Sequence, residues 1–468
     1  MARLGKRVKI IATIGPASAE ATVLEAMLRD GVDAVRINAS HTEPDAVGGW
    51  VRRIRRAGRR VGRDVAVMLD LQGIKRRIGD LPEPVQLKEG TAVVLGSRPG
   101  GDRIPAPVAA LRGHLRRGAD IFLDDGFLRL RVTAVKPTEI ACRVLRGGLL
   151  KARAGINLPG VPVRARIPTK KDRAHMEAAV ESGVDVFALS FVRSARDLQR
   201  CRRHAAGIPI IAKIERPEAV EAIDAVALAS NGILVARGDL AVEMKPEELP
   251  VLQKSLMAAA KRARMPVIVA TEMLASMVHS PRPTRAELLD VGNAVLDGAD
   301  ATMLTNETAI GRDPARAVRY MARILARVEG SLLTYDIETP RTPGGAATRP
   351  DWAVADAAVE TAHKVGAKAI VTITGSGRTA RLVSAGRPSV PVYSFSTEPA
   401  VRRRVALMWG VTAETVRRIR DPQAITTHLL DRLRAAGRIR RGNRVVVVFG
   451  SPLWAEGTKT NSVRIVVV

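Results

Sequence analysis

Charged side chains stand at the ends of two apolar runs between residues 208 and 239, IPIIAKIE and GILVARGD. Lys213 and Glu215 close the first run, and Arg237 and Asp239 close the second. A buried strand tolerates such groups only near its end, because an unpaired charge in a core is very costly. Two carboxylates and one ammonium at neighbouring strand ends could hold a divalent cation and an anionic substrate. A structural ion-pair network that caps the sheet is the simpler alternative.

The segment between these runs has helical spacing, with Ala219, Ile223 and Val226 on one side, so the stretch forms a strand–helix–strand unit. The same alternation extends over eight candidate strands, which predicts an α/β protein built on a (β/α)8 TIM barrel. The predicted strands cover residues 8–15, 33–38, 65–71, 184–191, 208–215, 232–239, 266–272 and 299–305.

Active sites of such barrels lie at the carboxyl ends of the strands. The predicted strands place a dense polar set at that edge: Arg36, Asn38, Asp70, Ser190, Lys213, Glu215, Asp239, Thr271, Glu272 and Thr305.

The alternation breaks after the third strand. Residues 73–160 are β-rich, with turn signals at Asp125–Gly126 and Lys136–Pro137, and predict a small inserted β-barrel domain. An insertion at the active-site end of the barrel could act as a lid. The expected division is a catalytic barrel from residues 1–72 and 161–335, an inserted lid at 73–160, a linker at 336–350 and a C-terminal α/β domain at 351–468.

The chain has 468 residues and a net charge of +28. A nucleic-acid-binding protein is one interpretation of that charge. However, the basic residues are spread over the whole length, and aromatic residues, which could stack on bases, make up only 3%. A generally basic, Arg- and Ala-biased proteome is the simpler explanation, and no specific nucleic-acid partner is expected.

The two cysteines, Cys142 and Cys201, have no metal-binding or redox spacing, which indicates a reducing compartment. The N-terminus has no signal-peptide pattern, and no apolar run approaches membrane-spanning length. We therefore expect a cytoplasmic protein without a membrane partner.

Long motifs over nearly the whole chain resemble pyruvate kinases. They are KIIATIGPAS (9–18), VRINASH (35–41), GINLPG (155–160), AKIE (212–215), VARGDLAVE (235–243) and the run at 280–311, with SGRTA (376–380) and EGTKTN (456–461) near the C-terminus. The resemblance implies that the chain moves the phosphoryl group of phosphoenolpyruvate to ADP and then protonates the enolate to give pyruvate. It also implies a need for Mg²⁺ or Mn²⁺.

The resemblance also assigns roles by position. Lys213, Thr271 and Arg36 match catalytic positions, and Glu215 and Asp239 match the metal ligands. The substrate would be held by Arg36, Lys213, Gly238, Asp239 and Thr271, and the nucleotide by Pro16, Asn38, His41, Arg77 and Glu307.

The third strand departs from the family pattern. Leu71 replaces a threonine and Lys75 replaces a glutamate that accompanies a K⁺ requirement in many members. A built-in ammonium could supply the charge of the monovalent cation, so K⁺ is expected to be unnecessary. The region concerned comprises Asn38, Ser40, Asp70, Leu71 and Lys75. Another departure is Arg216, at a position where asparagine is common.

A glycine-containing loop in the C-terminal domain sits between a predicted strand and a predicted helix, where backbone N–H groups suit a phosphate. By resemblance, it holds an effector phosphate in regulated pyruvate kinases. Its residues are Thr374, Ser376, Gly377, Arg378 and Thr379. An ordinary strand–helix turn is the alternative. A phosphorylated metabolite effector and a homotetramer are further expectations from the resemblance.

Two other functions compete with this interpretation. Another phosphoenolpyruvate or pyruvate barrel could make or break a C–C bond, but the β insertion, Arg77 and His41 argue against it. A degenerate paralogue could bind metabolites or RNA without turnover, which the net charge of +28 suggests and the intact Lys213 and Glu215 oppose.

Overall fold

The computed structural model describes residues 5–74, 76–97, 103–124, 126–161, 166–335 and 349–468. The central body is a closed barrel of eight parallel strands in the order β1-β17-β16-β15-β14-β13-β3-β2. All eight predicted strands are therefore confirmed. Their bounds are β1 (Lys9–Thr13), β2 (Ala34–Asn38), β3 (Ala66–Leu71), β13 (Val186–Leu189), β14 (Ile210–Ile214), β15 (Ile233–Ala236), β16 (Val267–Ala270) and β17 (Ala301–Leu304).

Both faces of these strands are buried, as expected for a parallel barrel with a helical coat. Small and aliphatic side chains such as Ala34, Met68 and Ile211 fill the interior, while Ile10, Val35 and their counterparts pack against the surrounding helices. The coat consists of α1 (Ala21–Asp30), α2 (Val47–Arg60), α4 (Lys170–Ser182), α5 (Ala195–Arg202), α6 (Pro217–Glu221), α7 (Ile223–Ala229), α8 (Arg237–Glu243), α9 (Leu249–Arg262), α10 (Arg285–Leu296), α11 (Asn306–Ala309) and α12 (Pro314–Tyr335).

One predicted strand ends in a helical turn that its sequence does not indicate. Residues 232–239 were expected to be extended, but β15 stops at Ala236, and Arg237, Gly238 and Asp239 form the first turn of α8. An acidic residue is favourable in a first helical turn because the helix dipole is positive there. The apolar run before it gives no sign of this early turn.

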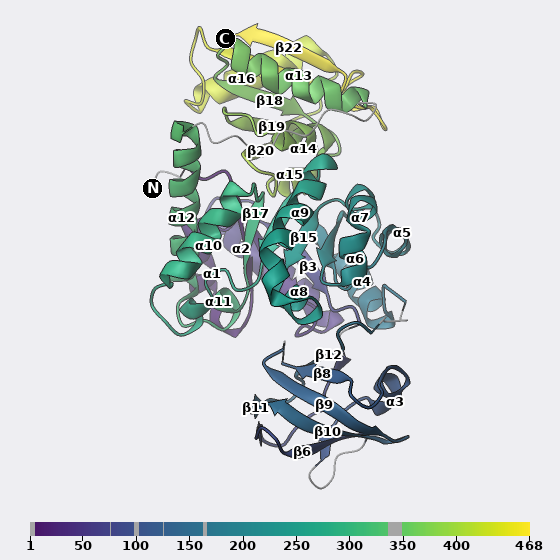
Figure 1. The fold of residues 1–468 in the computed structure, drawn as a ribbon. Coiled ribbons are helices and arrows are strands. Elements are labelled where there is room, and N and C mark those ends of the chain that lie inside the picture. The colour runs from purple at the N-terminus through teal and green to yellow at the C-terminus, as the bar shows by residue number, and fades with distance from the viewer. Residues whose placement is uncertain (1–4, 75, 98–102, 125, 162–165, 336–348) are drawn as a thin grey trace.

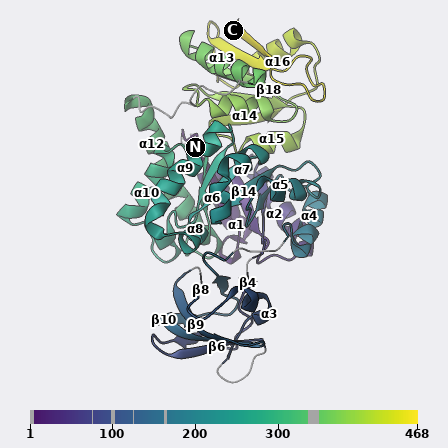
Figure 2. The same ribbon diagram turned by 45° about the vertical axis from the view of Figure 1, so that its right-hand side comes forward.

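The insertion between β3 and β13 has its own apolar core and lies at one end of the barrel (Figures 1 and 2). Seven of its strands pair in the order β4-β12-β8-β9-β10-β6-β7, and two more form the pair β11-β5. The elements are β4 (Arg76–Arg77), β5 (Val85–Leu87), β6 (Ala92–Gly96), β7 (Arg103–Pro105), α3 (Val108–Leu111), β8 (Asp120–Leu123), β9 (Leu128–Val135), β10 (Glu139–Arg146), β11 (Gly148–Leu150) and β12 (Gly155–Asn157).

The C-terminal domain lies at the opposite end of the barrel (Figure 1). Its sheet has the order β20-β19-β18-β21-β22, and only its last strand runs antiparallel to its neighbour. The elements are α13 (Pro350–Lys364), β18 (Ala369–Ile373), α14 (Arg378–Ala385), β19 (Val392–Ser396), α15 (Pro399–Val405), β20 (Val411–Thr415), α16 (Pro422–Ala435), β21 (Arg444–Phe449) and β22 (Ser462–Val467). Most of the predicted linker, residues 336–348, lies outside the described part of the chain.

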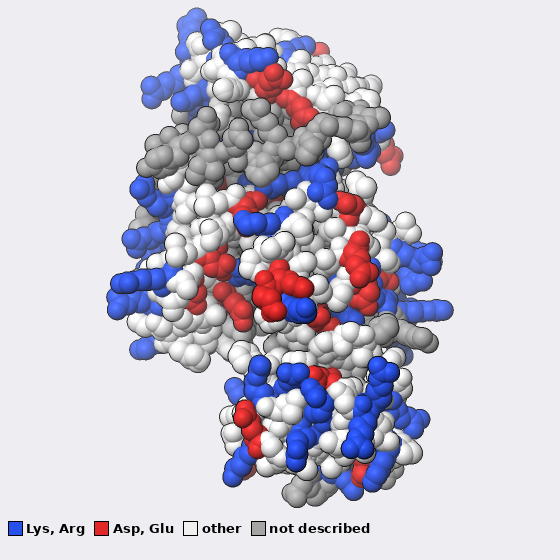
Figure 3. All heavy atoms as spheres, in the orientation of Figure 1, with Lys and Arg blue, Asp and Glu red and all other residues white. Residues whose placement is uncertain are grey.

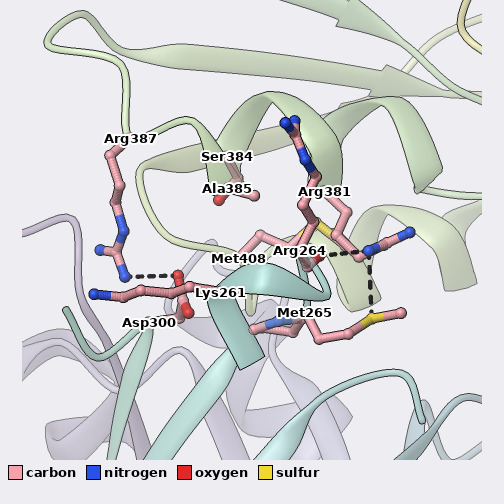
Figure 4. Close-up of a pocket in the computed structure, with 10 residues that line it drawn as sticks. Lys261, Arg264, Met265, Asp300, Arg381, Ser384, Ala385, Arg387 and Met408 are labelled. Carbon is pink, nitrogen blue, oxygen red and sulfur yellow. Dashed lines mark hydrogen bonds and ion pairs between the residues drawn. The ribbon is translucent and has the colours of Figure 1, made fainter. Parts of the chain in front are cut away.

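Ion pairs join the C-terminal domain to the amino-terminal ends of the barrel strands. Arg387 pairs with Asp300 at 2.9 Å (Figure 4). Arg264 pairs with Asp356. A small cavity of about 30 Å³ lies at this junction, beside Lys261. It is at the end of the barrel remote from the predicted chemistry.

No helix within the described ranges is both long and apolar enough to span a membrane. On the face shown in Figure 3, Lys and Arg side chains are distributed over the C-terminal domain, the barrel and the insertion.

Candidate active site

The carboxylate of Asp70 joins three strand ends. Asp70 is 2% exposed on β3, and its Oδ2 accepts a hydrogen bond from Nε of Arg36 on β2 at 2.7 Å. Its Oδ1 lies 3.2 Å from Nζ of Lys213 on β14 and accepts a hydrogen bond from Ser190 at 3.2 Å. Burial alone would raise the pKa of Asp70, but the charges of Lys213 and Arg36 outweigh burial and lower it. Asp70 is therefore an ionised acceptor that orients both cations.

The ammonium of Lys213 is surrounded by acceptors. It donates to Oγ of Ser190 at 2.7 Å and lies 2.7 Å from Oε1 of Glu215. Burial alone would lower the pKa of Lys213, but the carboxylates of Asp70, Glu215 and Asp239 raise it above its ordinary value. A fixed positive charge in such a site can stabilise negative charge that develops during a reaction.

Glu215 and Asp239 offer the donors that Mg²⁺ prefers. Glu215 is 1% exposed, and its Oε2 accepts the N–H of Phe191 at 2.8 Å. Burial and the negative charge of Asp239 raise the pKa of Glu215, although Lys213 opposes them, so a divalent cation between the two carboxylates would relieve their repulsion. The described residues contain no cluster of three or more His, Cys, Asp or Glu suited to a metal. Two carboxylates nevertheless fit Mg²⁺, which commonly takes its other ligands from water and substrate.

Thr271 occupies a strained position beside this cluster. Its φ of +71° is unusual for a β-branched residue, and such strain concentrates at functional sites. Its hydroxyl accepts the N–H of Gly238 at 2.8 Å and donates to the carbonyl of Ala270 at 2.6 Å. Arg237 donates to the carbonyl of Thr271 at 2.7 Å, so the segments that follow β15 and β16 are tied together.

Three basic groups form a second part of the site. His41 lies in the loop after β2 with part of its side chain exposed. Partial burial, and then the positive charges of Arg77 and Arg36, lower its pKa. Mutual repulsion among these groups would be relieved by an anion such as a nucleotide phosphate. Arg77 donates to the carbonyl of Arg153 at 2.9 Å, within the insertion.

The remaining predicted nucleotide and cation residues differ in accessibility. Pro16 is exposed, and the side-chain oxygen of Asn38 accepts the N–H of Ser40 at 3.0 Å. Glu307 is 1% exposed and accepts the N–H groups of Leu274 and Thr305, so it links two loops. A nucleotide would reach Glu307 only if these bonds changed.

Four residues of the predicted monovalent-cation region are described: Asn38 and Ser40 at and after the end of β2, and Asp70 and Leu71 at the end of β3. Leu71 is fully buried at the end of β3, next to Asp70. Lys75 lies outside the described residues.

The predicted effector loop is at the far end of the molecule, between β18 and α14. Thr374 accepts the N–H of Gly377 at 2.9 Å, and Thr379 shares a hydrogen bond with Thr460 at 2.9 Å, while Ser376 is exposed. Arg378 donates from Nε to the buried carboxylate of Asp351 at 2.6 Å. An effector phosphate would therefore compete with an internal carboxylate for this arginine.

Comparison with known proteins decides the family. Residues 5–318 match the model of the pyruvate kinase barrel domain, and residues 352–466 match that of the pyruvate kinase alpha/beta domain. The chain belongs to the pyruvate kinase family. A pyruvate kinase of Geobacillus stearothermophilus is 39% identical over 99% of this chain and 80% of its own length. One from Agrobacterium vitis is 38% identical over 99% of this chain and 98% of its own length.

A solved pyruvate kinase structure has the same fold. The structure from Cryptosporidium parvum aligns with a TM-score of 0.88 at 34% identity, covering 99% of this chain and 96% of its own. Membership in the pyruvate kinase family makes this chain a phosphotransferase of that kind.

Two features of the site escaped sequence reasoning. The strand-end pattern places Asp70 at the same edge as Arg36 and Lys213, but it does not show that the Asp70 carboxylate contacts both of them. Its place at the end of a strand was a usable signal, because neighbouring parallel strand ends meet. The second feature is a buried pair between Arg216 and Glu243, for which the sequence carries no comparable signal.

Proposed function

We propose that this pyruvate kinase transfers the phosphoryl group of phosphoenolpyruvate to ADP at the edge of the barrel that faces the insertion. The observation that supports this most strongly is the cluster in which Asp70 orients Arg36 and Lys213 while Glu215 lies 2.7 Å from the same ammonium. Phosphoryl transfer depends mainly on positioning and charge neutralisation, which such a cluster provides.

In the proposed reaction, the bond between phosphorus and the enol oxygen breaks as an oxygen of the ADP β-phosphate bonds to phosphorus. Arg36 grips the phosphoryl group, and Lys213 stabilises negative charge on it and on the enolate oxygen. Glu215 and Asp239 would hold a divalent cation, which supplies further positive charge. The enolate carbon then takes a proton, delivered through water on the Thr271 side. Gly238, Asp239 and Thr271 would hold the substrate carboxylate.

The basic group formed by His41, Arg77 and Arg36 supports the proposed position of the nucleotide phosphates, with Pro16, Asn38 and Glu307 around it. We also propose that Lys75 replaces K⁺ in the region that includes Asn38, Ser40, Asp70 and Leu71. The division into a barrel (1–72 and 161–335), a lid (73–160) and a C-terminal domain (351–468) belongs to the same proposal.

Regulation, assembly and location complete the proposal. The loop with Ser376 and Arg378 would take an effector phosphate in place of Asp351, in a cytoplasmic homotetramer. Velocity at subsaturating phosphoenolpyruvate should then rise with fructose 1,6-bisphosphate, ribose 5-phosphate, glucose 6-phosphate or AMP. A flat response to all four would remove the effector proposal.

The test of the reaction is pyruvate formation from phosphoenolpyruvate and ADP in four buffers: with Mg²⁺, with Mg²⁺ and K⁺, with Mn²⁺, and with a chelator. Turnover should occur in the first three and stop with the chelator. Activity only with K⁺ would keep the reaction and contradict the role of Lys75. No turnover together with salt-sensitive RNA binding would instead support the RNA-binding paralogue.

A further inference from the structure

A buried ion pair connects the two elements that carry the candidate metal ligands. Arg216 directly follows Glu215 at the start of α6, and Glu243 is the last residue of α8, whose first turn contains Asp239. Nη1 of Arg216 lies 2.7 Å from Oε2 of Glu243, and the two side chains are only 4% and 2% exposed. The pair therefore bridges the segment after β14 and the segment after β15.

The rest of the Arg216 guanidinium is also engaged. Nε donates to Glu218 at 3.2 Å, within the first turn of α6. Nη2 donates to the backbone carbonyl of Val161 at 2.9 Å. Val161 follows β12, the last strand of the insertion, so Arg216 reaches from the barrel to the chain that returns from the insertion.

Glu243 makes a second contact with that returning chain. Its Oε1 accepts a hydrogen bond from Nδ2 of Asn157 at 3.2 Å, and Asn157 is the last residue of β12. Asn157 is 4% exposed. The contacts among Arg216, Glu243, Asn157 and Val161 thus form one buried cluster between barrel and insertion, which we call the hinge cluster.

Position suggests that the hinge cluster does more than stabilise the fold. An ion pair at this depth is a weak source of stability, because both groups lose their hydration. A buried pair with several fixed hydrogen bonds does, however, define geometry closely. Here the geometry it defines includes the segments that bear Glu215 and Asp239 and the base of the insertion.

We propose that Arg216 is a positioning residue that couples the return connection of the insertion to the spacing of the two metal-binding carboxylates. The inference rests on the proposed function, since it takes Glu215 and Asp239 as the metal ligands. When the base of the insertion moves, Arg216 and Glu243 transmit the movement to both ligands.

The experiment compares four full-length proteins: wild type, Arg216→Met, the double variant Arg216→Met/Glu243→Leu, and the control Arg264→Met. Arg264 is also a buried arginine with a carboxylate partner, but it lies at the junction with the C-terminal domain. The double variant removes both charges, so it stays folded even if a lone buried Glu243 prevents the single variant from folding.

The first measurement is amide hydrogen exchange of residues 155–161 in metal-free protein. Loss of the hinge cluster should lower protection of this segment about 10-fold in both Arg216 variants, while Arg264→Met leaves it unchanged. Unchanged protection in the Arg216 variants, or an equal loss in Arg264→Met, would overturn the proposal.

The second measurement is Mn²⁺ binding by electron paramagnetic resonance without substrates. Loss of the supporting contacts should weaken Mn²⁺ binding about 10-fold in the Arg216 variants alone. Altered exchange with unaltered Mn²⁺ affinity would show a purely structural pair and overturn the coupling. Both measurements are independent of turnover, so an inactive wild type would reject the proposed reaction and still leave the coupling to be judged.

Discussion

The two ends of the barrel both contain buried carboxylates, but they are partnered differently. At the end that faces the C-terminal domain, Asp185 accepts hydrogen bonds from Arg55 and Arg403, and Asp300 pairs with Arg387. At the end that faces the insertion, Asp70 and Glu215 both contact the single ammonium of Lys213, and Asp70 also contacts Arg36.

The difference shows that a buried charge near a strand does not by itself identify an active site. Arg403 and Arg387 come from the C-terminal domain, so their ion pairs fasten two domains together. At the other end, the charged groups belong to neighbouring barrel strands, and the carboxylates of Asp70 and Glu215 share the ammonium of Lys213. Such a cluster can rearrange when an anionic substrate and a divalent cation enter, whereas the pairs at the junction hold two domains together.

The largest expected effect separates the two ends directly. Lys213→Met should reduce kcat about 1,000-fold, because the charge opposite the transferring phosphoryl group is lost. The matched control is Arg387→Met at the other end, which should leave kcat within about threefold of wild type and lower the thermal midpoint. Steady-state kinetics and thermal unfolding of both variants measure this. Equal losses of kcat in the two variants would contradict the assignment of catalysis to the end that faces the insertion.

Asp185→Asn tests the opposite end. Asp185 is 1% exposed, and its replacement leaves Arg55 and Arg403 without their carboxylate. The free energy of unfolding should fall by about 3 kcal/mol, because a broken buried pair leaves uncompensated charge. Urea unfolding followed by circular dichroism gives the value. A change below about 0.5 kcal/mol, the size of an ordinary surface substitution, would contradict the proposed fastening role.

Lys75→Glu tests the proposed replacement of K⁺ by a lysine. Without K⁺ the variant should lose about 10-fold in kcat/KM for phosphoenolpyruvate, and added K⁺ should restore most of it, since a monovalent cation would replace the missing ammonium. Rates are measured in K⁺-free buffer and across a K⁺ titration. If the variant remains fully active without K⁺, Lys75 has no such role.

The smallest effect concerns Lys261, at the junction with the C-terminal domain. Burial, aided by Arg387, lowers its pKa from 10.5 to about 8. Between pH values of about 8 and 10.5, the unfolded chain therefore binds more protons than the folded protein. The free-energy cost of burying the charged Lys261 ammonium falls as the pH rises through this range, so the folded protein gains stability.

Lys261→Met should accordingly raise the free energy of unfolding by about 1–2 kcal/mol at pH 7, less than the full linkage value because the hydrogen bond to Asp297 is lost. The gain should shrink by pH 9.5. Urea unfolding of both proteins at the two pH values measures the difference. A gain that grows with pH would reverse the assigned sign.

The fold was predictable because each barrel strand can be recognised in the sequence as a short apolar run. Runs such as VIVA and ILVA are aliphatic throughout, and polar residues follow them. The polar ends also predicted that Arg36, Asp70, Lys213 and Glu215 would meet. What they could not show is how the charges are shared, because that depends on distances between strands.

Contacts between remote segments were beyond the sequence. Arg378 contacts Asp351 on the preceding helix, a partner that the loop motif does not indicate. Asn157 and Glu243 are 86 positions apart in the sequence. The fold brings them within hydrogen-bonding distance where the insertion returns to the barrel. The early start of α8 at Arg237 was missed because the strand pattern before it continues without a break.

The most direct test follows the phosphoryl group itself. The full-length protein with phosphoenolpyruvate, ADP and Mg²⁺ is observed by ³¹P nuclear magnetic resonance, beside Lys213→Met. The account predicts that the phosphoenolpyruvate signal is replaced by the γ-phosphate signal of ATP in the wild type only. Release of inorganic phosphate, an unchanged spectrum, or equal conversion by the variant would contradict it.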